Sequence, residues 1–330
     1  MHKDYGKFCW YELITPDVPA AQRFYETVVG WSMRDSGMPG MNYTLAYAGE
    51  TQIAGLMETP AEAKDMPPLW MGYIFTDRIE ETLKDVTANG GQIHRQPQDI
   101  PGVGRFAIAA DPHGAVFSLF STEDEGPAQP EMMTPGHVGW NELMAGDLDG
   151  AWDFYSKTFG WTKDMAVDMS EGGMGTYQTF AVRGGNAIGG MMTNPPGSPA
   201  PPFWGYYFVV EGLDAAGKRV TDGGGKLLMG PMEVPGGAWI LNCLDPQGAY
   251  FSLTSGRNKA GGTASFPLAI SPRLAHTPLD GGKRPSPRGT ESVCRSRPVS
   301  TTLPTTNTTT RSVSDPRSSG SSRRRIPRPR

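Results

Sequence analysis

The sequence is poor in the side chains that most often bind metals or form disulfide bonds. Its 330 residues include three cysteines and five histidines, and no two cysteines have CxxC spacing. Three thiols cannot all pair, so Cys9, Cys243 and Cys294 predict reduced cysteines in a cytoplasmic protein. The sequence also lacks an apolar run of membrane-spanning length and an apolar secretory leader. We therefore expect a cytoplasmic location and no membrane partner.

Charge is distributed unevenly along the chain. Residues 257–330 carry 15 Lys and Arg against 3 Asp and Glu, whereas residues 1–256 carry 15 against 31. The basic segment is rich in Pro, Ser and Thr and poor in large apolar residues, so burial cannot offset the entropy of ordering it. We predict a disordered tail over 257–330. Its arginines lack interleaved aromatic residues, which argues against nucleic-acid binding.

An internal repeat organises the rest of the chain. Shifted by 130 residues, CWYELITPD (9–17) matches GWNELMAGD (139–147) in its Trp, Glu, Leu and Asp. Farther along, an offset of 134 pairs PPLWMGY (67–73) with PPFWGYY (201–207). The same offset pairs the later segments DPHGAVFSL and DPQGAYFSL. A register kept over most of each half predicts two similar domains in tandem.

The domain boundaries follow from the repeat. We expect the first domain over residues 5–124, a linker over 125–134 and the second domain over 135–256. Each domain divides into two units with the pattern strand, helix and three strands. The ordered part of the chain is therefore expected to be α+β, with four βαβββ units.

Local signals mark the ends of the predicted elements. Asp17 is a favourable helix N-cap, and apolar residues follow it at helical spacing. Strands are expected at about residues 43–48 and 51–57, with Gly49 in a tight turn between them. The segments DPHG and DPQG fit a type I turn that joins the last two strands of each domain.

These motifs together resemble one known family. They are a WxEL strand, a following Asp, a helix ending in FYxxxxGW, and a DPxG turn that leads to FSL. This combination is similar to the vicinal oxygen chelate (VOC) superfamily, the group of glyoxalases, bleomycin-resistance proteins and extradiol dioxygenases. The resemblance covers about residues 5–256 and implies that paired units curl into cup-shaped sheets. It does not imply one activity, because the superfamily includes isomerases, lyases, dioxygenases and drug-binding proteins.

The resemblance also indicates where metal ligands would stand. Metal-dependent members bind a divalent ion through His, Gln or Glu from the first and last strands of their units, leaving positions open for substrate oxygens. In this chain the first-strand position is Trp10 or Trp140, and neither side chain binds metals. The remaining positions hold Met71, Gly205, Ser118 and Ser252 and, approximately, Leu56 and Met191. We predict no tightly bound metal and no other cofactor, with a divalent metal as the alternative.

His137 is the one histidine close to a predicted core strand. It precedes Trp140 by three residues and Glu142 by five, and odd spacing in a regular strand directs it to the opposite face. A bulge would be needed to bring it beside Glu142. We predict an ordinary hydrogen-bonded histidine and leave it out of the site.

The predicted site contains aromatic residues and two carboxylates. Strand alternation places Glu12 with Trp10, and Glu142 with Trp140, on the face that lines the cup in this fold. A carboxylate there is costly unless it is paired, solvated or used. Each Glu is either a structural hydrogen-bond acceptor or a catalytic carboxylate that orients a ligand or acts as a general base. Further ligand-binding walls are expected from Trp70, Tyr73, Trp204 and Tyr207, with core packing as the alternative for at least half of them.

The predicted function is the binding of a small, partly aromatic organic molecule without a tightly held metal. The first alternative is an enzyme, either with metal-free acid–base chemistry at Glu12 or Glu142 or with metal ligands that the alignment misplaces. A second alternative is an interaction protein whose basic tail contacts nucleic acid. Four units in one chain can complete both cups internally, so we expect a monomer or a homodimer.

Overall fold

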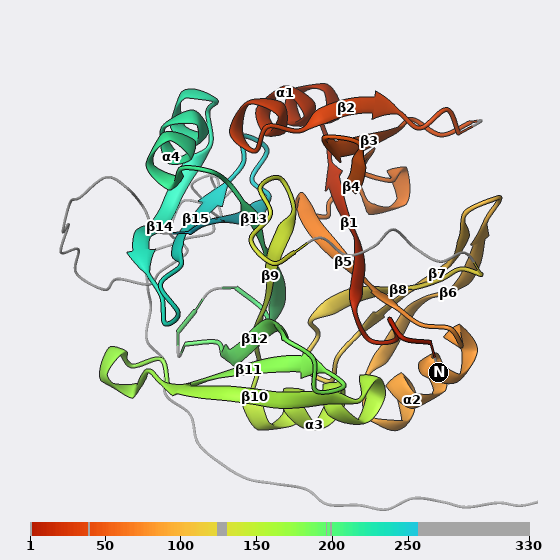
Figure 1. Ribbon diagram of the computed structural model, residues 1–330. Coiled ribbons are helices and arrows are strands. Elements are labelled where there is room, and N and C mark those ends of the chain that lie inside the picture. The colour runs from red at the N-terminus through yellow and green to blue at the C-terminus, as the bar shows by residue number, and fades with distance from the viewer. Residues whose placement is uncertain (1, 39, 124–130, 196, 199, 257–330) are drawn as a thin grey trace, which may run out of the picture. The chain divides into compact units, whose positions relative to one another are not determined.

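A computed structural model shows the arrangement of the elements (Figure 1). The described residues are 2–38, 40–123, 131–195, 197–198 and 200–256. All the described residues belong to one compact unit. The predicted tail lies outside the described residues. No helix in the described part of the chain is long and apolar enough to cross a membrane.

The first half forms one eight-stranded mixed sheet. Its strands lie in the order β2-β3-β4-β1-β5-β8-β7-β6. Strand β1 pairs in parallel with β4 and antiparallel with β5, so two βαβββ units meet at their first strands. The elements are β1 (Phe8–Thr15), α1 (Val18–Val28), β2 (Ser32–Asp35), β3 (Tyr43–Ala48), β4 (Thr51–Glu58), the 3₁₀ turn η1 (Ala61–Ala63), β5 (Leu69–Phe75), α2 (Ile79–Ala88), β6 (Gln92–Ile100), β7 (Gly104–Ala110) and β8 (Val116–Ser121).

The second half repeats this sheet strand for strand. Its order is β10-β11-β12-β9-β13-β16-β15-β14. The elements are β9 (Val138–Ala145), α3 (Leu148–Phe159), β10 (Trp161–Asp168), η2 (Ser170–Gly172), β11 (Thr176–Val182), β12 (Ala187–Thr193), β13 (Phe203–Val209), α4 (Leu213–Asp222), β14 (Lys226–Glu233), β15 (Trp239–Leu244) and β16 (Tyr250–Ser255). The predicted α+β class with four βαβββ units is confirmed.

The local signals of the sequence act where they were expected. The Asp17 side chain accepts a hydrogen bond from the Ala20 amide and caps α1. In the predicted type I turn at DPHG, the Gly114 amide donates to the Asp111 carbonyl at 3.0 Å, the bond that closes such a turn. Gly49, between β3 and β4, has φ +60°, a conformation that favours glycine.

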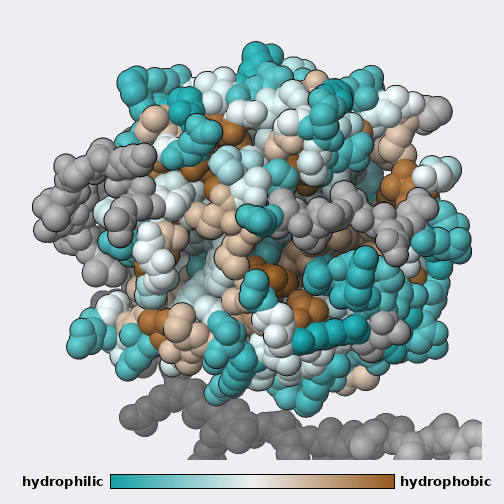
Figure 2. All heavy atoms as spheres, viewed as in Figure 1, coloured by the Kyte–Doolittle hydropathy of each residue, from teal (hydrophilic) through white to brown (hydrophobic). Residues whose placement is uncertain are grey.

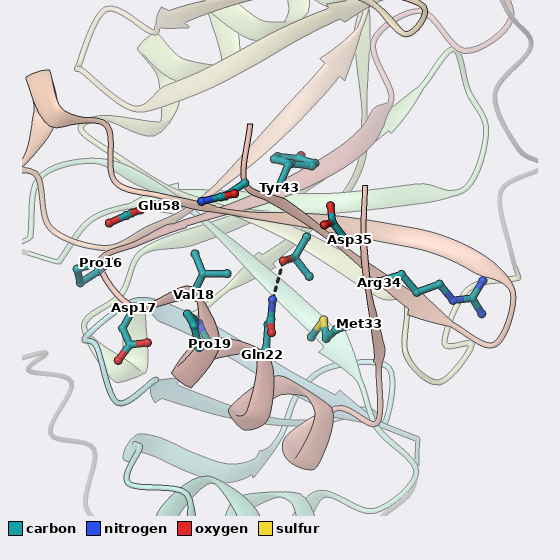
Figure 3. Close-up of a pocket in the computed structure, with 12 residues that line it drawn as sticks. Pro16, Asp17, Val18, Pro19, Gln22, Met33, Arg34, Asp35, Tyr43 and Glu58 are labelled. Atoms are coloured by element: carbon teal, nitrogen blue, oxygen red, sulfur yellow. Dashed lines mark hydrogen bonds between the residues drawn. The ribbon is translucent and has the colours of Figure 1, made fainter. Parts of the chain in front are cut away.

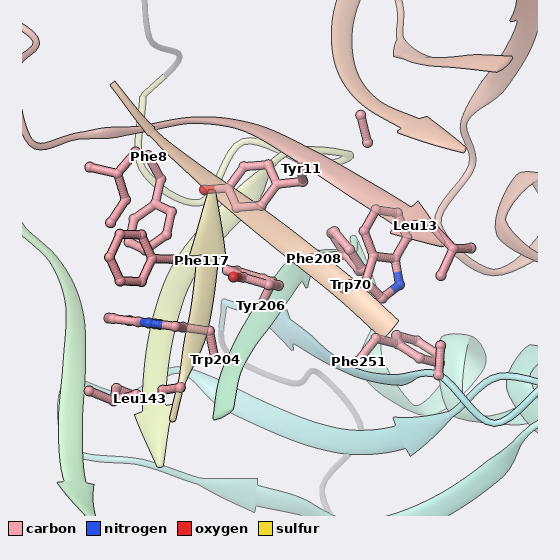
Figure 4. Close-up of a cluster of buried hydrophobic side chains, with 14 of the residues drawn as sticks. Phe8, Tyr11, Leu13, Trp70, Phe117, Leu143, Trp204, Tyr206, Phe208 and Phe251 are labelled. Carbon is pink, nitrogen blue, oxygen red and sulfur yellow. The ribbon is translucent and has the colours of Figure 1, made fainter. Parts of the chain in front are cut away.

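Both sheets contribute to one hydrophobic core (Figure 4). Leu13 and Trp70 of the first half and Leu143 and Trp204 of the second are each at most 5% exposed and belong to the same buried cluster. The Trp70 and Phe208 rings, from different halves, lie 4.9 Å apart between centroids. The face viewed in Figure 2 is mostly hydrophilic, with apolar side chains in small separate patches. Burial of this shared core therefore holds the two halves together.

Matching hydrogen bonds also cross between the halves. The Trp31 indole donates to the Gly136 carbonyl at 2.6 Å, and the Trp161 indole donates to the Gly6 carbonyl at 2.8 Å. Two tyrosine–aspartate bonds are related in the same way and join Tyr25 to Asp245 and Tyr155 to Asp111. The repeat of the sequence thus produces an approximately symmetric pairing of the halves.

Two of the three cysteines lie within the described residues. Cys9 and Cys243 are free thiols, and burial raises the pKa of each to about 12. Both therefore stay protonated and unreactive at neutral pH. Cys294 lies outside the described residues.

Candidate functional site

Strand β1 carries the centre of a connected group of polar and aromatic side chains. Each carboxylate oxygen of Glu12 accepts a hydrogen bond at 2.8 Å, one from the Tyr43 hydroxyl and one from the Tyr73 hydroxyl. The Trp10 indole N–H donates to the Tyr43 hydroxyl oxygen at 3.0 Å. We call these four residues the first network.

Strand β9 carries the same arrangement in the second half. Glu142 accepts hydrogen bonds from the Tyr177 hydroxyl at 3.0 Å and from the Tyr207 hydroxyl at 2.7 Å. The Trp140 indole donates to the Tyr177 hydroxyl oxygen at 2.7 Å. This second network reproduces every bond of the first, so the repeat preserves a set of contacts as well as a fold.

The register of the central strands brings each network together. In the first half Trp10 lies opposite Tyr73, and Glu12 lies opposite Met71, so their side chains share one face of the sheet. Leu13 lies on the other face and belongs to the shared core. We call the face that carries Glu12, or Glu142 in the second half, the cup face.

A glycine makes room for the tyrosine that comes from two strands away. Gly55 on β4 lies opposite Glu12, and the Tyr43 ring passes directly over it. A Cβ on Gly55 would overlap the Tyr43 hydroxyl. Gly190 has the same relation to Tyr177 in the second half. Both networks therefore require a residue without a side chain at this position.

Burial shapes the protonation of the site. It raises the pKa of Glu12 and of Glu142, while the two tyrosine hydrogen bonds on each carboxylate act in the opposite direction. Glu12 is 8% exposed, and Glu142 is half-buried. Burial, followed by the charge of the nearby glutamate, raises the pKa of Tyr73 and Tyr207, so both phenols keep their protons and donate.

The structure brings six of the eight residues predicted from the sequence into the two networks. They are Trp10, Glu12, Tyr73, Trp140, Glu142 and Tyr207. Trp70 and Trp204 lie outside the networks, in the shared core. The Trp70 indole donates to the Tyr25 hydroxyl at 2.9 Å, and the Trp204 indole donates to the Tyr155 hydroxyl at 2.9 Å. These two tryptophans help to hold the two halves together.

Four residues that form the networks were not predicted from the sequence. Tyr43 and Tyr177 supply one donor to each carboxylate, and Gly55 and Gly190 leave the space that they need. A signal was present, because Tyr177 follows Tyr43 at the same offset of 134 that relates the later parts of the halves. The repeated tyrosine indicates a network residue only when the pairing of β3 with β4 and of β4 with β1 is known.

The residues on the cup face do not fit a tightly held metal. Each network has one carboxylate, and tyrosine hydroxyls already donate to both of its oxygens. Ser118, at one expected ligand position, donates to the Met71 sulfur at 2.8 Å. Leu56 and Met191 are fully buried in the core. Within the described ranges no three His, Cys, Asp or Glu side chains come together as a metal site would need.

His137 remains separate from the second network although the strand is irregular. The register between β9 and β13 shifts between Val138 and Trp140, which is the kind of bulge that could have redirected it. The His137 Nδ1 atom nevertheless lies 3.2 Å from the Pro135 carbonyl oxygen. The predicted local hydrogen bond is therefore present.

A separate pocket of about 560 Å³ lies beside the start of α1 (Figure 3). Gln22 donates to the Thr44 hydroxyl at 2.6 Å, and Arg34 and Asp35 are among the residues that line the space. Tyr43 is shared with the first network, but Glu12 is not among the described residues that line this pocket. The pocket is thus a neighbour of the first network and a competing location for a ligand.

Comparisons with known sequences give consistent matches over both halves. The sequence profile of the glyoxalase/bleomycin resistance protein/dioxygenase superfamily matches residues 7–119 and 134–253. A putative glyoxylase, CFP32, of Mycobacterium tuberculosis is 32% identical over 249 residues, which cover 74% of this chain and 92% of that protein. The anthracycline biosynthesis protein DnrV of Streptomyces peucetius is 29% identical over 278 residues, covering 79% and 98%.

Solved structures share the fold at low sequence identity. The Mn(II)-bound glyoxalase from Novosphingobium aromaticivorans has a TM-score of 0.54 and 15% identity, with 76% of this chain and 82% of that chain covered. The 2,3-dioxygenase LapB from Pseudomonas sp. KL28 has a TM-score of 0.54 and 13% identity, with 80% and 97% covered. At such identities the likeness concerns the fold alone.

Proposed function

The chain belongs to the glyoxalase/bleomycin resistance protein/dioxygenase superfamily, and from this premise we propose that its two networks bind small, flat organic molecules without a tightly held metal. The main support is the duplicated Trp–Tyr–Glu–Tyr arrangement on β1 and β9. A buried carboxylate is a costly way to stabilise a sheet, because apolar residues of similar volume do so at least as well. A carboxylate in both halves, buried at Glu12 and half-buried at Glu142, favours a role in recognition.

The geometry suggests how a ligand would be held. Each indole N–H is already bonded to a tyrosine, which fixes the ring, while Trp10 and Trp140 remain only half-buried. A flat ligand can stack on such a fixed ring. A carboxylate oxygen can accept more than one hydrogen bond, so Glu12 or Glu142 can still accept one from a ligand hydroxyl or amine. The likeness to an anthracycline biosynthesis protein is in keeping with an aromatic ligand.

Site-resolved fluorine NMR tests this proposal. The full chain is labelled with 5-fluorotryptophan, and its eight tryptophan signals are assigned by single Trp→Phe substitutions. Addition of 2-naphthol should shift the signals of Trp10, Trp140 or both, and should leave those of Trp70 and Trp204 in place. The core tryptophans are thus internal controls. Shifts confined to the core signals, or no shift at saturating 2-naphthol, would refute binding at the networks.

Acid–base catalysis is a second candidate function, favoured by the raised pKa of both glutamates. A carboxylate with a raised pKa is a stronger base at neutral pH than an exposed one. The tyrosine donors would also hold Glu12 and Glu142 in fixed orientations. A Glu→Gln change should then abolish turnover of any substrate found while leaving its binding in place.

The raised pKa of Glu12 predicts a pH-dependent stability. A carboxyl whose folded-state pKa is raised stabilises the fold most when neutral. That contribution is fully present below the unfolded pKa of about 4.3 and is lost as the pH rises through the higher folded pKa. Since glutamine does not ionise, Glu12→Gln should lose less stability than the wild type as the pH rises from about 4.3 through the folded pKa of Glu12. Urea unfolding at a series of pH values in this range measures the free energy of unfolding, with the exposed Glu171→Gln as control. Equal slopes for wild type and Glu12→Gln would contradict the burial argument.

The side chains on the two cup faces predict that the purified protein contains little metal. Protein prepared without added metal should contain far less than one zinc, nickel, iron or manganese ion per domain, measured by elemental analysis. About one ion per domain, together with an activity that a chelator abolishes, would show that the proposed metal-free binding is wrong. Glu12 and Glu142 would then be the first ligands to test, followed by His137.

A further inference from the structure

The cup face of each half continues beyond its network, and there the two halves differ. Residues in direct register across neighbouring strands share a face of the sheet. In the first half such a row consists of Trp10, Tyr73, Ser118, Ile108 and Arg95. In the second half the equivalent row consists of Trp140, Tyr207, Ser252, Asn242 and Met229. The first three positions agree in residue type, and the last two do not.

The first row ends on a cation that lies over an aromatic wall. The Arg95 guanidinium lies 6.0 Å from the centre of the Phe106 ring, and that ring lies 6.5 Å from the Tyr73 ring. Burial raises the pKa of Glu12, and the positive charge of Arg95 acts on that carboxyl in the opposite direction. Ile108, beside Arg95, adds an apolar surface. The first cup face thus combines aromatic and apolar walls with one guanidinium.

The partners of Arg95 within the described residues hold it weakly. Its guanidinium donates to the Gln98 amide oxygen at 3.4 Å and lies 3.7 Å from a carboxylate oxygen of Glu62. The Glu62 side chain is 72% exposed, and ion pairs with such an exposed group contribute little. An anion that reaches Arg95 from the cup face can therefore replace Glu62 at little cost.

The second cup face has neutral polar groups instead. Gly205 stands where the first half has Met71, and the Tyr250 ring covers it, with Cε1 3.1 Å from the position of an added Cβ. The Ser252 hydroxyl donates to the Asn242 amide oxygen at 3.1 Å and lies 3.3 Å from the Tyr250 hydroxyl. Burial and the charge of Glu142 raise the pKa of Tyr250, which therefore remains a phenol that donates.

Two of these groups, Tyr250 and Asn242, are replaced by apolar residues in the first half. Val116 stands at the position of Tyr250, and Ile108 stands at the position of Asn242. The Asn242 amide nitrogen makes no hydrogen bond to any residue that the structure describes, so it is available to a ligand carbonyl. The second cup face therefore offers hydrogen bonds without a positive charge along its row.

We propose that the two networks take different classes of ligand. The first binds an aromatic anion, such as an aryl carboxylate, whose negative group pairs with Arg95. The second binds a neutral aromatic molecule whose hydroxyl or carbonyl groups bond with Tyr250 and Asn242. This proposal rests on the function proposed above. Each network has a glutamate that repels an anion, but Arg95 can offset the repulsion in the first half, whereas Met229 cannot offset it in the second.

A reciprocal exchange between the halves tests the proposal. The fluorine-labelled full chain is titrated with 2-naphthoate and with 2-naphthol, and the Trp10 and Trp140 signals are followed separately. We expect 2-naphthoate to bind at least about tenfold more tightly at Trp10 than at Trp140, the effect of one charge-assisted hydrogen bond. Arg95→Met should remove this preference, and Met229→Arg should create it at Trp140. Arg95→Lys keeps the charge and should retain most of the affinity.

The outcomes separate the two proposals. Equal affinity of 2-naphthoate for both networks, or an unchanged affinity in Arg95→Met, would overturn the assignment of different ligands while leaving ligand binding intact. A lack of response to either compound at both tryptophans would overturn the proposed function itself. Loss of affinity in Arg95→Met and also in Arg95→Lys would assign the effect to the shape of arginine, and the charge argument would be wrong.

Discussion

Trp70→Ala and Trp204→Ala should each lower the free energy of unfolding by about 3–5 kcal/mol, the usual cost of truncating a large buried aromatic residue. Each ring is 5% exposed, belongs to the core shared by the two halves, and bonds through its indole N–H to a buried tyrosine. Removing it leaves a cavity and takes one hydrogen-bond donor from a tyrosine hydroxyl that still donates to an aspartate. Urea unfolding followed by circular dichroism measures the loss.

The tryptophans of the networks provide the matched comparison. Trp10 and Trp140 are half-buried, so Trp10→Ala and Trp140→Ala should cost only about 1–2 kcal/mol of stability. They should instead weaken 2-naphthol binding at their own network by at least about tenfold, because the stacking surface is lost. If truncation of Trp10 and of Trp70 lowered stability equally and left binding unchanged, the division between core and site residues would be wrong.

Gly55→Ala and Gly190→Ala should disable the networks although they add a single methyl group. The new Cβ of Gly55→Ala would overlap the Tyr43 hydroxyl, so the tyrosine ring must leave. Glu12 then loses one donor, and the Trp10 indole loses its acceptor. We expect a loss of about 1–3 kcal/mol in stability and about tenfold or more in 2-naphthol affinity.

A double-mutant cycle identifies the cause of that loss. If Gly55→Ala acts through displacement of Tyr43, it should add little to the effect of Tyr43→Ala in the combined variant. Gly212→Ala is the control, because an added Cβ there meets no atom within 4 Å. Full additivity of the Gly55 and Tyr43 changes would show that the glycine acts elsewhere.

Much of the fold could be predicted because its signals are local and occur twice. The Asp17 cap, the DPxG turns and the strands flanking Gly49 each depend on a few adjacent residues. The repeat then relates the two halves without any knowledge of their packing. The shared core could not be predicted in the same way, because nothing local indicates which faces of the two sheets meet.

The candidate site was predictable along a strand but less so across strands. Alternation correctly groups Trp10 with Glu12, since they are two residues apart on β1. The same rule, applied within PPLWMGY, separates Trp70 from Tyr73, because the two residues are three positions apart on the strand and so face opposite sides. Tyr43 reaches Glu12 only through the register of β3 with β4 and of β4 with β1. That register is set by tertiary pairing.

A crystal structure of the full chain soaked with 2-naphthol tests the central claim most directly. The pocket lined by Gln22 and Arg34 beside α1 is an alternative location for the ring. We predict electron density for the naphthalene ring against the face of Trp10 or Trp140, with its hydroxyl directed to the glutamate of that network. Density in the pocket beside α1, with both networks free of the compound, would contradict the proposal that the duplicated networks are the ligand-binding sites.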